Sequence, residues 1–137
     1  MLLTVITAFA GAQTAGANDA LTGNQQAVNY IYYDYDDSGI KATHTDGSCT
    51  DYTQVVSSET VEQVFWGTSG SETWYVVSGD VTINNGVVLV FGNVNLILCD
   101  GAKLTVNDRI KLQNNSSLTV YAQSTGNAIL SFPINCT

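Results

Sequence analysis

The chain repeats itself at an almost constant interval. Residues 81–89, Val-Thr-Ile-Asn-Asn-Gly-Val-Val-Leu, recur at 104–112 as Leu-Thr-Val-Asn-Asp-Arg-Ile-Lys-Leu, an offset of 23. A second echo aligns residues 95–98 with residues 117–120 at an offset of 22. A period of this size is typical of a solenoid, in which each coil buries its apolar face against the next coil. The sequence therefore predicts coils of 22 or 23 residues.

Within each coil, apolar and polar residues alternate. Thr82 lies between Val81 and Ile83, and Thr105 lies between Leu104 and Val106. This alternation predicts short strands with one buried face, and clusters of Asn, Asp, Gly and Ser between them predict tight corners. A leucine-rich repeat is disfavoured because its unit returns through a helix, and no helical pattern separates these strands. We predict an all-β fold, a right-handed parallel β-helix of few coils, preceded by a β-rich cap or hairpin.

The same alternation assigns the two faces of the strands. We expect Thr82, Thr105, Lys111 and Thr119 outside and one shared core inside. The predicted core residues are Val81, Ile83, Val87, Leu89, Val94, Leu96, Leu98, Leu104, Val106, Ile110, Leu112, Leu118 and Val120.

Asn84 and Asn107 occupy equivalent places in successive coils. Two interpretations remain open for this pair. The side-chain amides form a ladder inside a corner, each donating to the next carbonyl, or Asn is present only because it suits a turn.

Composition limits the classes of function. A chain of 137 residues suits one domain, and 45% hydrophobic with 12% charged residues is globular rather than disordered. The net charge is −8 with only four Lys and Arg residues. Nucleic acids and anionic membranes are disfavoured as partners because both require clustered cations.

Residues 1–17 resemble a secretory signal segment. An apolar run too short to span a bilayer is followed by Ala-x-Ala spacings, which predicts a mature chain beginning near Gln13 or Asn18. The first cation is Lys41, so the charged beginning of a typical signal is missing. A late-starting gene model, an atypical signal and a buried N-terminal strand are the alternatives. The signal interpretation predicts a secreted or cell-surface protein without stable membrane insertion.

Residues 18–72 form the predicted cap, and residues 73–137 form the predicted coils. The cap is rich in aromatic residues that either bind a ligand such as a sugar or seal the first coil. We expect Trp66 and Trp74 to pack near the junction of cap and coils. The candidate ligand-binding residues are Tyr30, Tyr32, Tyr33, Tyr35 and Trp66.

An acidic turn in the cap matches part of a calcium loop. Asp34, Asp36 and Ser38 stand at positions 1, 3 and 5, with Gly39 at position 6. Position 12 is Thr45 rather than the bidentate acid that closes such a loop. A plain acidic turn is therefore preferred to a calcium site, and no other cofactor is indicated.

The three cysteines give no clear framework. An odd count leaves one of Cys49, Cys99 and Cys136 unpaired, and a Cys49–Cys136 bridge remains open. Cys99 follows a strand at a corner, where packing is the expected role. A zinc site is not supported, because His44 is the only histidine and no Cys-x-x-Cys spacing occurs.

The coil acids do not form a catalytic pair. Glycoside hydrolysis needs two carboxylates that converge from neighbouring coils. Asp80 aligns with Lys103, and Asp108 aligns with an Asn rather than an acid. Asp100 is the remaining acid of the predicted coils. We assign no catalytic residue and expect no enzymatic activity.

Three stretches of the chain carry a resemblance. They are Trp-Tyr-Val-Val-Ser-Gly-Asp-Val-Thr-Ile at 74–83, Gly-Asn-Val-Asn-Leu-Ile-Leu-Cys-Asp-Gly at 92–101 and Ser-Leu-Thr-Val-Tyr-Ala-Gln-Ser-Thr-Gly at 117–126. Together they resemble a β-helix repeat segment of large secreted or cell-surface proteins of gut bacteria, over about residues 48–126. Asn93 and Asn95 stand where that family usually has Asp and His, and Ala122 replaces a Gly.

The resemblance implies right-handed β-helix coils and a carbohydrate-binding or adhesive role. Chains of that family continue through further coils and domains. This chain stops at Thr137, so a truncated reading frame and a domain fragment are two interpretations. The third is that Pro133 marks a C-terminal cap, because it cannot donate to a further ladder. Two classes of function follow as hypotheses. The first is a non-catalytic extracellular surface module that binds a glycan or host surface, or spaces other domains. The second is a fragment of a polysaccharide-acting enzyme whose catalytic coils are missing.

Overall fold

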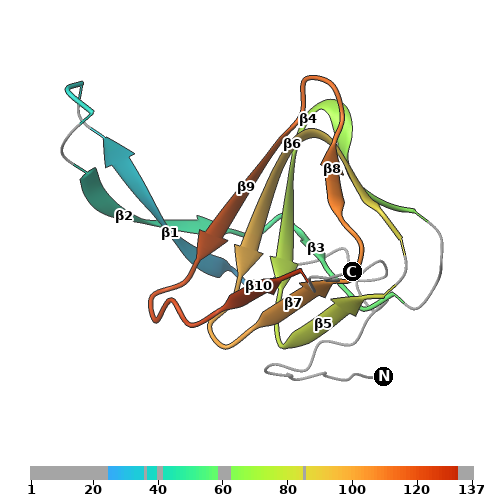
Figure 1. Ribbon diagram of the computed structural model, residues 1–137. Helices are drawn as coiled ribbons and strands as arrows, with labels where there is room; N and C mark the ends of the chain where they lie inside the picture. The colour runs from blue at the N-terminus through green and yellow to red at the C-terminus, as the bar shows by residue number, and fades with distance from the viewer. Residues whose placement is uncertain (1–24, 36, 40–41, 59–62, 85, 133–137) are drawn as a thin grey trace, which may run out of the picture.

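The computed structural model describes residues 25–35, 37–39, 42–58, 63–84 and 86–132. These residues contain strands and turns but no helix, and they include no helix long and apolar enough to cross a membrane. The signal-like segment, the predicted mature start and Cys136 lie outside the described residues. The strands are β1 (Val28–Tyr35), β2 (Ala42–Cys49), β3 (Thr53–Gln54), β4 (Val64–Val77), β5 (Asp80–Ile83), β6 (Val88–Leu98), β7 (Lys103–Val106), β8 (Ile110–Leu112), β9 (Ser117–Ala122) and β10 (Ile129–Ser131) (Figure 1).

The strands from β3 onward stack in parallel as a β-solenoid. One sheet has the order β2-β1-β9-β6-β4-β3, with β8 also paired to β6, and a second sheet has the order β10-β7-β5. Each turn of the chain therefore adds one strand to each sheet: β4 and β5, then β6 and β7, then β9 and β10. Figure 1 shows the first sheet as a tall wall and the second as a floor that meets it at an angle. The predicted all-β, β-helical fold is confirmed.

The repeat sets the pairing of β5 with β7. Val81 pairs with Leu104 and Ile83 with Val106, as the offset of 23 predicts. All four side chains are buried in one core. At the following corner, the Nδ2 of Asn107 donates to the Oδ1 of Asn84 at 2.7 Å. The amide ladder is thus present, and it links two successive coils.

The predicted register of β8 is wrong by one residue. Ile110 pairs with Val88, an offset of 22, rather than with Val87. Val88 and Val90 therefore fill the core at 0% exposure, whereas Val87 and Leu89 are only half-buried and lie outside the core cluster. The run from 87 to 90 is apolar throughout, so alternation could not decide which face is inside.

The predicted register of β9 is wrong by two residues. Leu118 pairs with Val94, an offset of 24 rather than 22. A shift of two residues preserves the face, and Leu118 packs against the core as expected. Leu112 and Val120, predicted to be core residues, are 47% and 43% exposed. They belong to the last coil, and no further coil covers them within the described residues.

The hairpin of β1 and β2 attaches to the last coil rather than to the first. Ile31 pairs antiparallel with Ala122 of β9, so the hairpin does not seal the first coil as expected; within the predicted cap, β3 is the strand that pairs with β4 of the first coil. After β2, residues 50–52 lead to β3, which pairs with β4 at the other side of the sheet. The chain therefore crosses the outer face of the wall. β4 also spans the expected domain boundary at 72/73, and its pairing with β6 begins at Val64.

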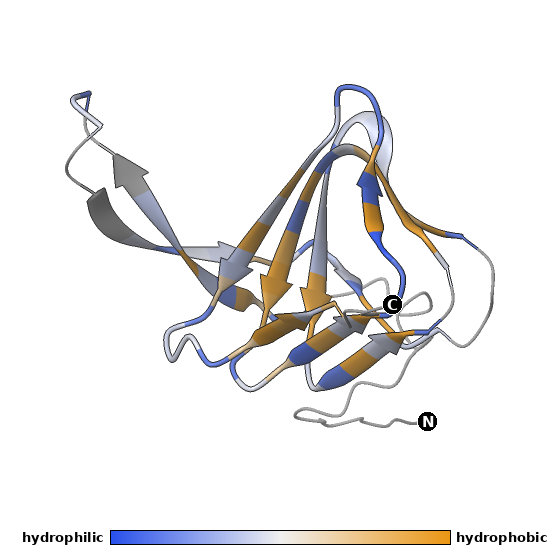
Figure 2. Ribbon diagram, in the orientation of Figure 1, coloured by the Kyte–Doolittle hydropathy of each residue, from blue (hydrophilic) through white to orange (hydrophobic). Residues whose placement is uncertain are grey.

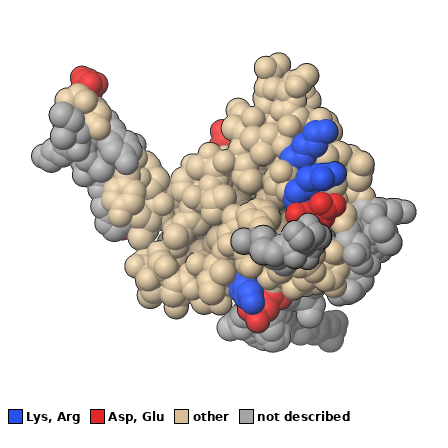
Figure 3. Space-filling model, in the orientation of Figure 1, with Lys and Arg blue, Asp and Glu red and all other residues tan. Residues whose placement is uncertain are grey.

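Hydropathy and charge follow this arrangement. Apolar residues concentrate on the strands of the solenoid, while the corners are polar (Figure 2). Among the described residues the cations are Lys103 on β7, Lys111 on β8 and Arg109 beside it. Figure 3 shows Lys and Arg side chains over the β7 and β8 side of the molecule, away from the hairpin.

A glycine corner bends the wall. β6 turns at Gly92, which has φ of 69° and lies against the corresponding bend of β4. A Cβ atom at Gly92 would collide with the backbone carbonyl oxygens of Thr68 and Ser71. Only glycine fits this position, because both the backbone angle and the close approach exclude a side chain.

Candidate functional site

The outer face of the wall is a regular grid of side chains. Alternation along β4, β6 and β9 turns every second residue away from the core, and the parallel register places these residues in rows. One row is polar, the next combines an indole with polar groups, and the third is mainly apolar. The rows are Glu72-Asn93-Ser117, Trp74-Asn95-Thr119 and Val76-Ile97-Tyr121.

Hydrogen bonds fix the polar part of the grid. The Oε1 of Glu72 accepts a hydrogen bond from the indole Nε1 of Trp74 at 2.9 Å and another from the Nδ2 of Asn95 at 3.2 Å. The hydroxyl of Tyr121 donates to the Oδ1 of Asn95 at 3.4 Å. The carboxylate and the indole are therefore held in one orientation on an exposed surface.

An aromatic cluster joins the hairpin to this face. The rings of Trp74 and Tyr121 stack with centroids 5.5 Å apart, and Tyr30 lies 5.0 Å from Trp74 and 4.8 Å from Tyr121. Burial raises the pKa of Tyr30 and of Tyr121 above the ordinary value. The cluster packs around the buried Cys49, Val76 and Ile97, and it holds the base of the hairpin against the wall.

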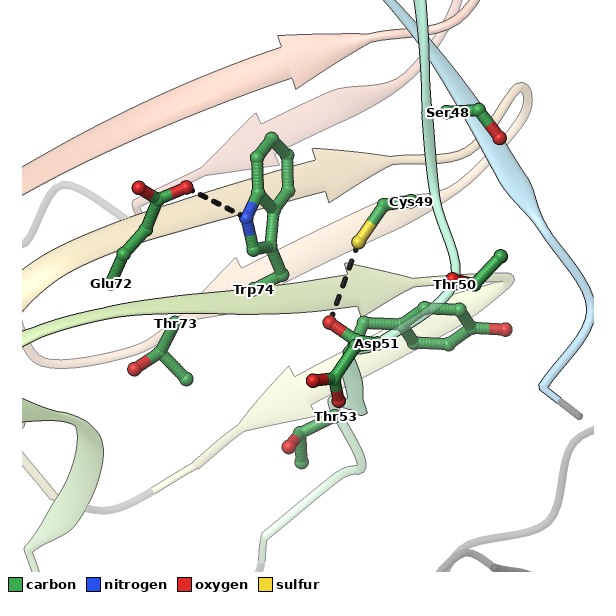
Figure 4. Close-up of a pocket in the computed structure, with 9 residues that line it drawn as sticks. Ser48, Cys49, Thr50, Asp51, Thr53, Glu72, Thr73 and Trp74 are labelled. Carbon is green, nitrogen blue, oxygen red and sulfur yellow. Dashed lines mark hydrogen bonds between the residues drawn. The ribbon is translucent and has the colours of Figure 1, made fainter. Parts of the chain in front are cut away.

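A groove of about 410 Å³ opens beside this cluster. Figure 4 shows Glu72 and Trp74 of β4 on one side of it and the segment from Ser48 to Thr53 on the other. Its lining combines two aromatic rings, two carboxylates and several hydroxyls. The lining residues are Ser48, Cys49, Thr50, Asp51, Tyr52, Thr53, Glu72, Thr73 and Trp74. We call this the first groove.

The segment from Ser48 to Thr53, which crosses the outer face of the wall, is fixed by hydrogen bonds of its own. We call it the crossing segment. Gln25 donates through Nε2 to the carbonyl of Tyr52 at 2.9 Å and accepts from the Tyr52 N–H at 3.1 Å. The Tyr52 hydroxyl donates to the carbonyl of Gln26 at 3.0 Å. The side of the first groove that faces Trp74 is therefore held in place by residues that lie outside the repeat.

Of the aromatic residues predicted to bind a ligand, the structure brings Tyr30 and Tyr32 together, with ring centroids 6.0 Å apart, and buries Trp66 elsewhere. Trp66 is 3% exposed, packs in the solenoid core and stacks on Tyr75 at 5.6 Å, so its assignment to a ligand surface is wrong. Tyr30 and Tyr32 are half-buried, whereas Tyr33 is 60% exposed. The side chain of Tyr35 lies outside the described part of the structure. Trp74 lies at the junction of hairpin and coils, as expected, whereas Trp66 lies in the core of the coils rather than at that junction.

The calcium prediction is not tested. Asp36 and the side chain of Asp34 lie outside the described residues, and Ser38 is exposed. The described residues contain no group of three or more His, Cys, Asp or Glu side chains able to hold a metal ion.

The two described cysteines are free thiols. Cys49 is buried, and its Sγ lies 3.4 Å from the carbonyl oxygen of Asp51, to which it donates. Cys99 is half-buried and packs against the cluster of Cys49, Val76 and Ile97. Burial raises the pKa of both thiols, so they act here as small apolar side chains.

The coil acids point to structural roles. Asp80 stands opposite Lys103 in the floor, and Asp108 lies 4.0 Å from Arg109. The Asp100 carboxylate accepts the N–H of Thr125 at 3.2 Å and so closes a corner loop. Asp80 and Asp108 do not line the first groove.

The main groove residues were missed from the sequence. Glu72, Asp51 and Tyr52 fell in the predicted cap, where no repeat assigned a face to them. The alternation Glu72-x-Trp74-x-Val76 is the signal that could have placed them, since it continues the pattern of the wall strands.

A scan against protein-family models and searches of the curated proteins and of the solved structures found no match to this chain.

Proposed function

We propose that this chain is a non-catalytic, extracellular carbohydrate-binding module, and that its sugar site is the first groove. The observation that carries the proposal is the pairing of an oriented indole with an oriented carboxylate, Trp74 with Glu72, at the edge of a groove. The composition of residues 1–17 supports export from the cell.

The lining suits a sugar chemically. A sugar ring presents apolar C–H groups on its faces and hydroxyls around its edge, so it needs an aromatic surface beside polar acceptors. Trp74 and Tyr52 supply aromatic surface. Glu72 and Asp51 supply acceptors, and threonine hydroxyls supply groups that both donate and accept. A volume of about 410 Å³ lies within the range of roughly 300–1,000 Å³ typical of small-molecule sites.

The acids of the groove favour binding over hydrolysis. A glycosidase needs one carboxyl group that donates a proton and a second carboxylate across the scissile bond. Glu72 already accepts hydrogen bonds from the side chains of Trp74 and Asn95, which suits an acceptor that orients a sugar hydroxyl. Asp51 lines the same groove, so the alternative of a polysaccharide-acting enzyme is tested through this pair.

The binding test compares two aromatic residues of the same strand. Trp74 lines the first groove, whereas Phe65 is 60% exposed, stacks on Phe91 and lines neither end of that groove. We expect Trp74→Ala to weaken binding at least about tenfold in calorimetry, as truncation of a central contact does. Phe65→Ala keeps the wild-type affinity. The probes are linear oligosaccharides of glucose, mannose and N-acetylglucosamine.

Three outcomes contradict the proposal. If none of the glycan probes binds the wild-type chain, or if Phe65→Ala and Trp74→Ala lose affinity equally, the first groove is not a sugar site. If the wild-type chain releases reducing ends from a bound glycan and Glu72→Gln or Asp51→Asn abolishes that release, the module is an enzyme.

A further inference from the structure

A second groove adjoins the first. It has a volume of about 430 Å³ and lies between the base of the hairpin and the end of β9. Its lining residues are Asn29, Tyr30, Ile31, Asp46, Gly47, Ser48, Asp100, Gln123 and Ser124. Ser48 lines both grooves, so the two are separated only by the end of β2.

An aromatic surface runs from one groove to the other. Trp74 lines the first groove, Tyr30 lines the second, and their ring centroids lie 5.0 Å apart. The Tyr30 ring also lies directly over Gly47, where a Cβ atom would collide with it. The missing side chain at Gly47 therefore lets the aromatic surface continue across the hairpin.

Hydrogen bonds hold Gln123, which lines the second groove, in a fixed position. Gln123 accepts the N–H of Asp100 at 2.8 Å and donates through Nε2 to the carbonyl of Asn29 at 2.7 Å. One side chain thus joins a corner of the solenoid to β1 of the hairpin. The second groove is preorganised, which lowers the entropic cost of binding.

The charge of the two grooves has one sign. The carboxylates that line them are Asp51 and Glu72 in the first and Asp46 and Asp100 in the second. Among the residues that the structure describes, no Lys, Arg or His lines either groove, and the described Lys and Arg side chains lie over the β7 and β8 side (Figure 3). A ligand that carries carboxylates would meet like charge from Asp51, Glu72 and Asp100, which opposes binding.

We infer that the two grooves form one extended site for an uncharged linear oligosaccharide, and that the same site rejects acidic sugars. This inference rests on the proposed function and adds its substrate class. One part of the oligosaccharide stacks against Trp74 in the first groove, and the next part crosses Ser48 into the second groove. Selectivity comes from the lining carboxylates, which accept hydrogen bonds from neutral hydroxyls and repel uronates.

The charge test uses one backbone in three forms. The neutral oligosaccharide that binds best among the glucose, mannose and N-acetylglucosamine probes is compared with its derivative oxidised at the primary hydroxyls to carboxylates, and with the methyl ester of that derivative. We expect the carboxylate form to bind at least about tenfold more weakly at low ionic strength. The methyl ester recovers most of the affinity, and added salt narrows the gap.

The length test uses a groove-filling variant. Ser124 is exposed and lines the second groove only. We expect affinity to rise from disaccharide to hexasaccharide in the wild-type chain, and Ser124→Tyr to remove that rise. Ser69→Tyr, at an exposed position that lines neither groove, is the matched control.

The outcomes separate this inference from the proposed function. If no neutral oligosaccharide binds, both fail. If a neutral glycan binds through Trp74 but the carboxylate form binds equally well, the charge selection is wrong. If the methyl ester is as weak as the carboxylate form, the loss comes from the altered hydroxyls, and charge selection is again wrong. If affinity does not depend on chain length, or if Ser124→Tyr behaves like Ser69→Tyr, the second groove is not part of the site.

Discussion

At the residue scale, position along the solenoid decides what a side chain contributes. Leu104 and Leu112 both face the interior, yet Leu104 is 0% exposed while Leu112 is 47% exposed. The difference arises because coils lie on both sides of Leu104, with β5 on one side and β10 on the other. Burial on both sides, rather than residue type, therefore sets the stabilising contribution.

These two leucines give a matched stability test. We expect Leu104→Ala to lower the free energy of unfolding by about 2–5 kcal/mol, because it leaves a cavity in a closed core. Leu112→Ala costs no more than about 1 kcal/mol, since much of its side chain is already in water. Urea denaturation measures both values. Equal losses would contradict the proposed core.

The half-buried phenols of Tyr30, Tyr52 and Tyr121 predict a loss of stability in alkali. Burial raises the pKa of Tyr30, Tyr52 and Tyr121 in the folded chain. The unfolded chain ionises first, so their contribution is complete below about pH 10 and falls as the pH rises beyond it. The pKa values of Cys49 and Cys99 are also raised in the folded chain. Ionisation of these thiols in the unfolded chain therefore begins to lower the unfolding free energy at about pH 9.

Phenylalanine variants test this origin. Tyr121→Phe removes one ionisable group from the buried cluster, so we expect the fall in unfolding free energy between about pH 9 and pH 11 to become smaller. Tyr33→Phe removes the hydroxyl of a 60% exposed side chain and leaves the fall unchanged. A fall that both variants reduce equally would assign it to a different cause.

At the scale of elements, the repeat predicts strands better than it predicts their register. The pairing of β5 with β7 follows from the echo at 23 residues because polar Thr82 and Thr105 mark the outer face. The predicted register of β8 was wrong by one residue because its partner on β6 lies in an unbroken run of apolar residues. Corner lengths also differ between coils, so the observed offsets include 22, 23 and 24 residues.

The corner glycines allow an element-scale test. Gly92 and Gly70 have φ of 69° and 80°, so alanine strains the backbone at either position by about 1–2 kcal/mol. A Cβ at Gly70 has no atom within 4 Å, whereas one at Gly92 collides with the carbonyl oxygens of Thr68 and Ser71. Overpacking adds about 1–3 kcal/mol in Gly92→Ala alone.

Thermal and urea unfolding distinguish the two variants. We expect Gly92→Ala to be clearly less stable than Gly70→Ala, with both less stable than the wild-type chain. If the two variants unfold at the same urea concentration, close packing of the bends of β4 and β6 is not what requires glycine at position 92.

At the scale of the whole molecule, the fold was predictable and the site was not. The solenoid is written in local alternation and in a repeat, and both can be read along the sequence. The first groove instead joins Trp74 of β4 to a crossing segment, Ser48–Thr53, that has no repeated counterpart. That segment is placed by an aromatic cluster and by the pairing of Ile31 with Ala122. Such contacts between distant residues leave no periodic signal.

The two tryptophans make the central claim directly measurable. Trp74 lines the first groove and donates its indole N–H to Glu72, whereas Trp66 is 3% exposed in the solenoid core. The wild-type chain therefore carries one reporter at the proposed sugar site and one internal control, and Trp74→Phe assigns the two indole N–H resonances. During titration with the neutral oligosaccharide, we expect the Trp74 resonance to move in proportion to occupancy and the Trp66 resonance to stay in place. Binding that leaves the Trp74 resonance unchanged would contradict the proposal that this chain holds sugars in the first groove.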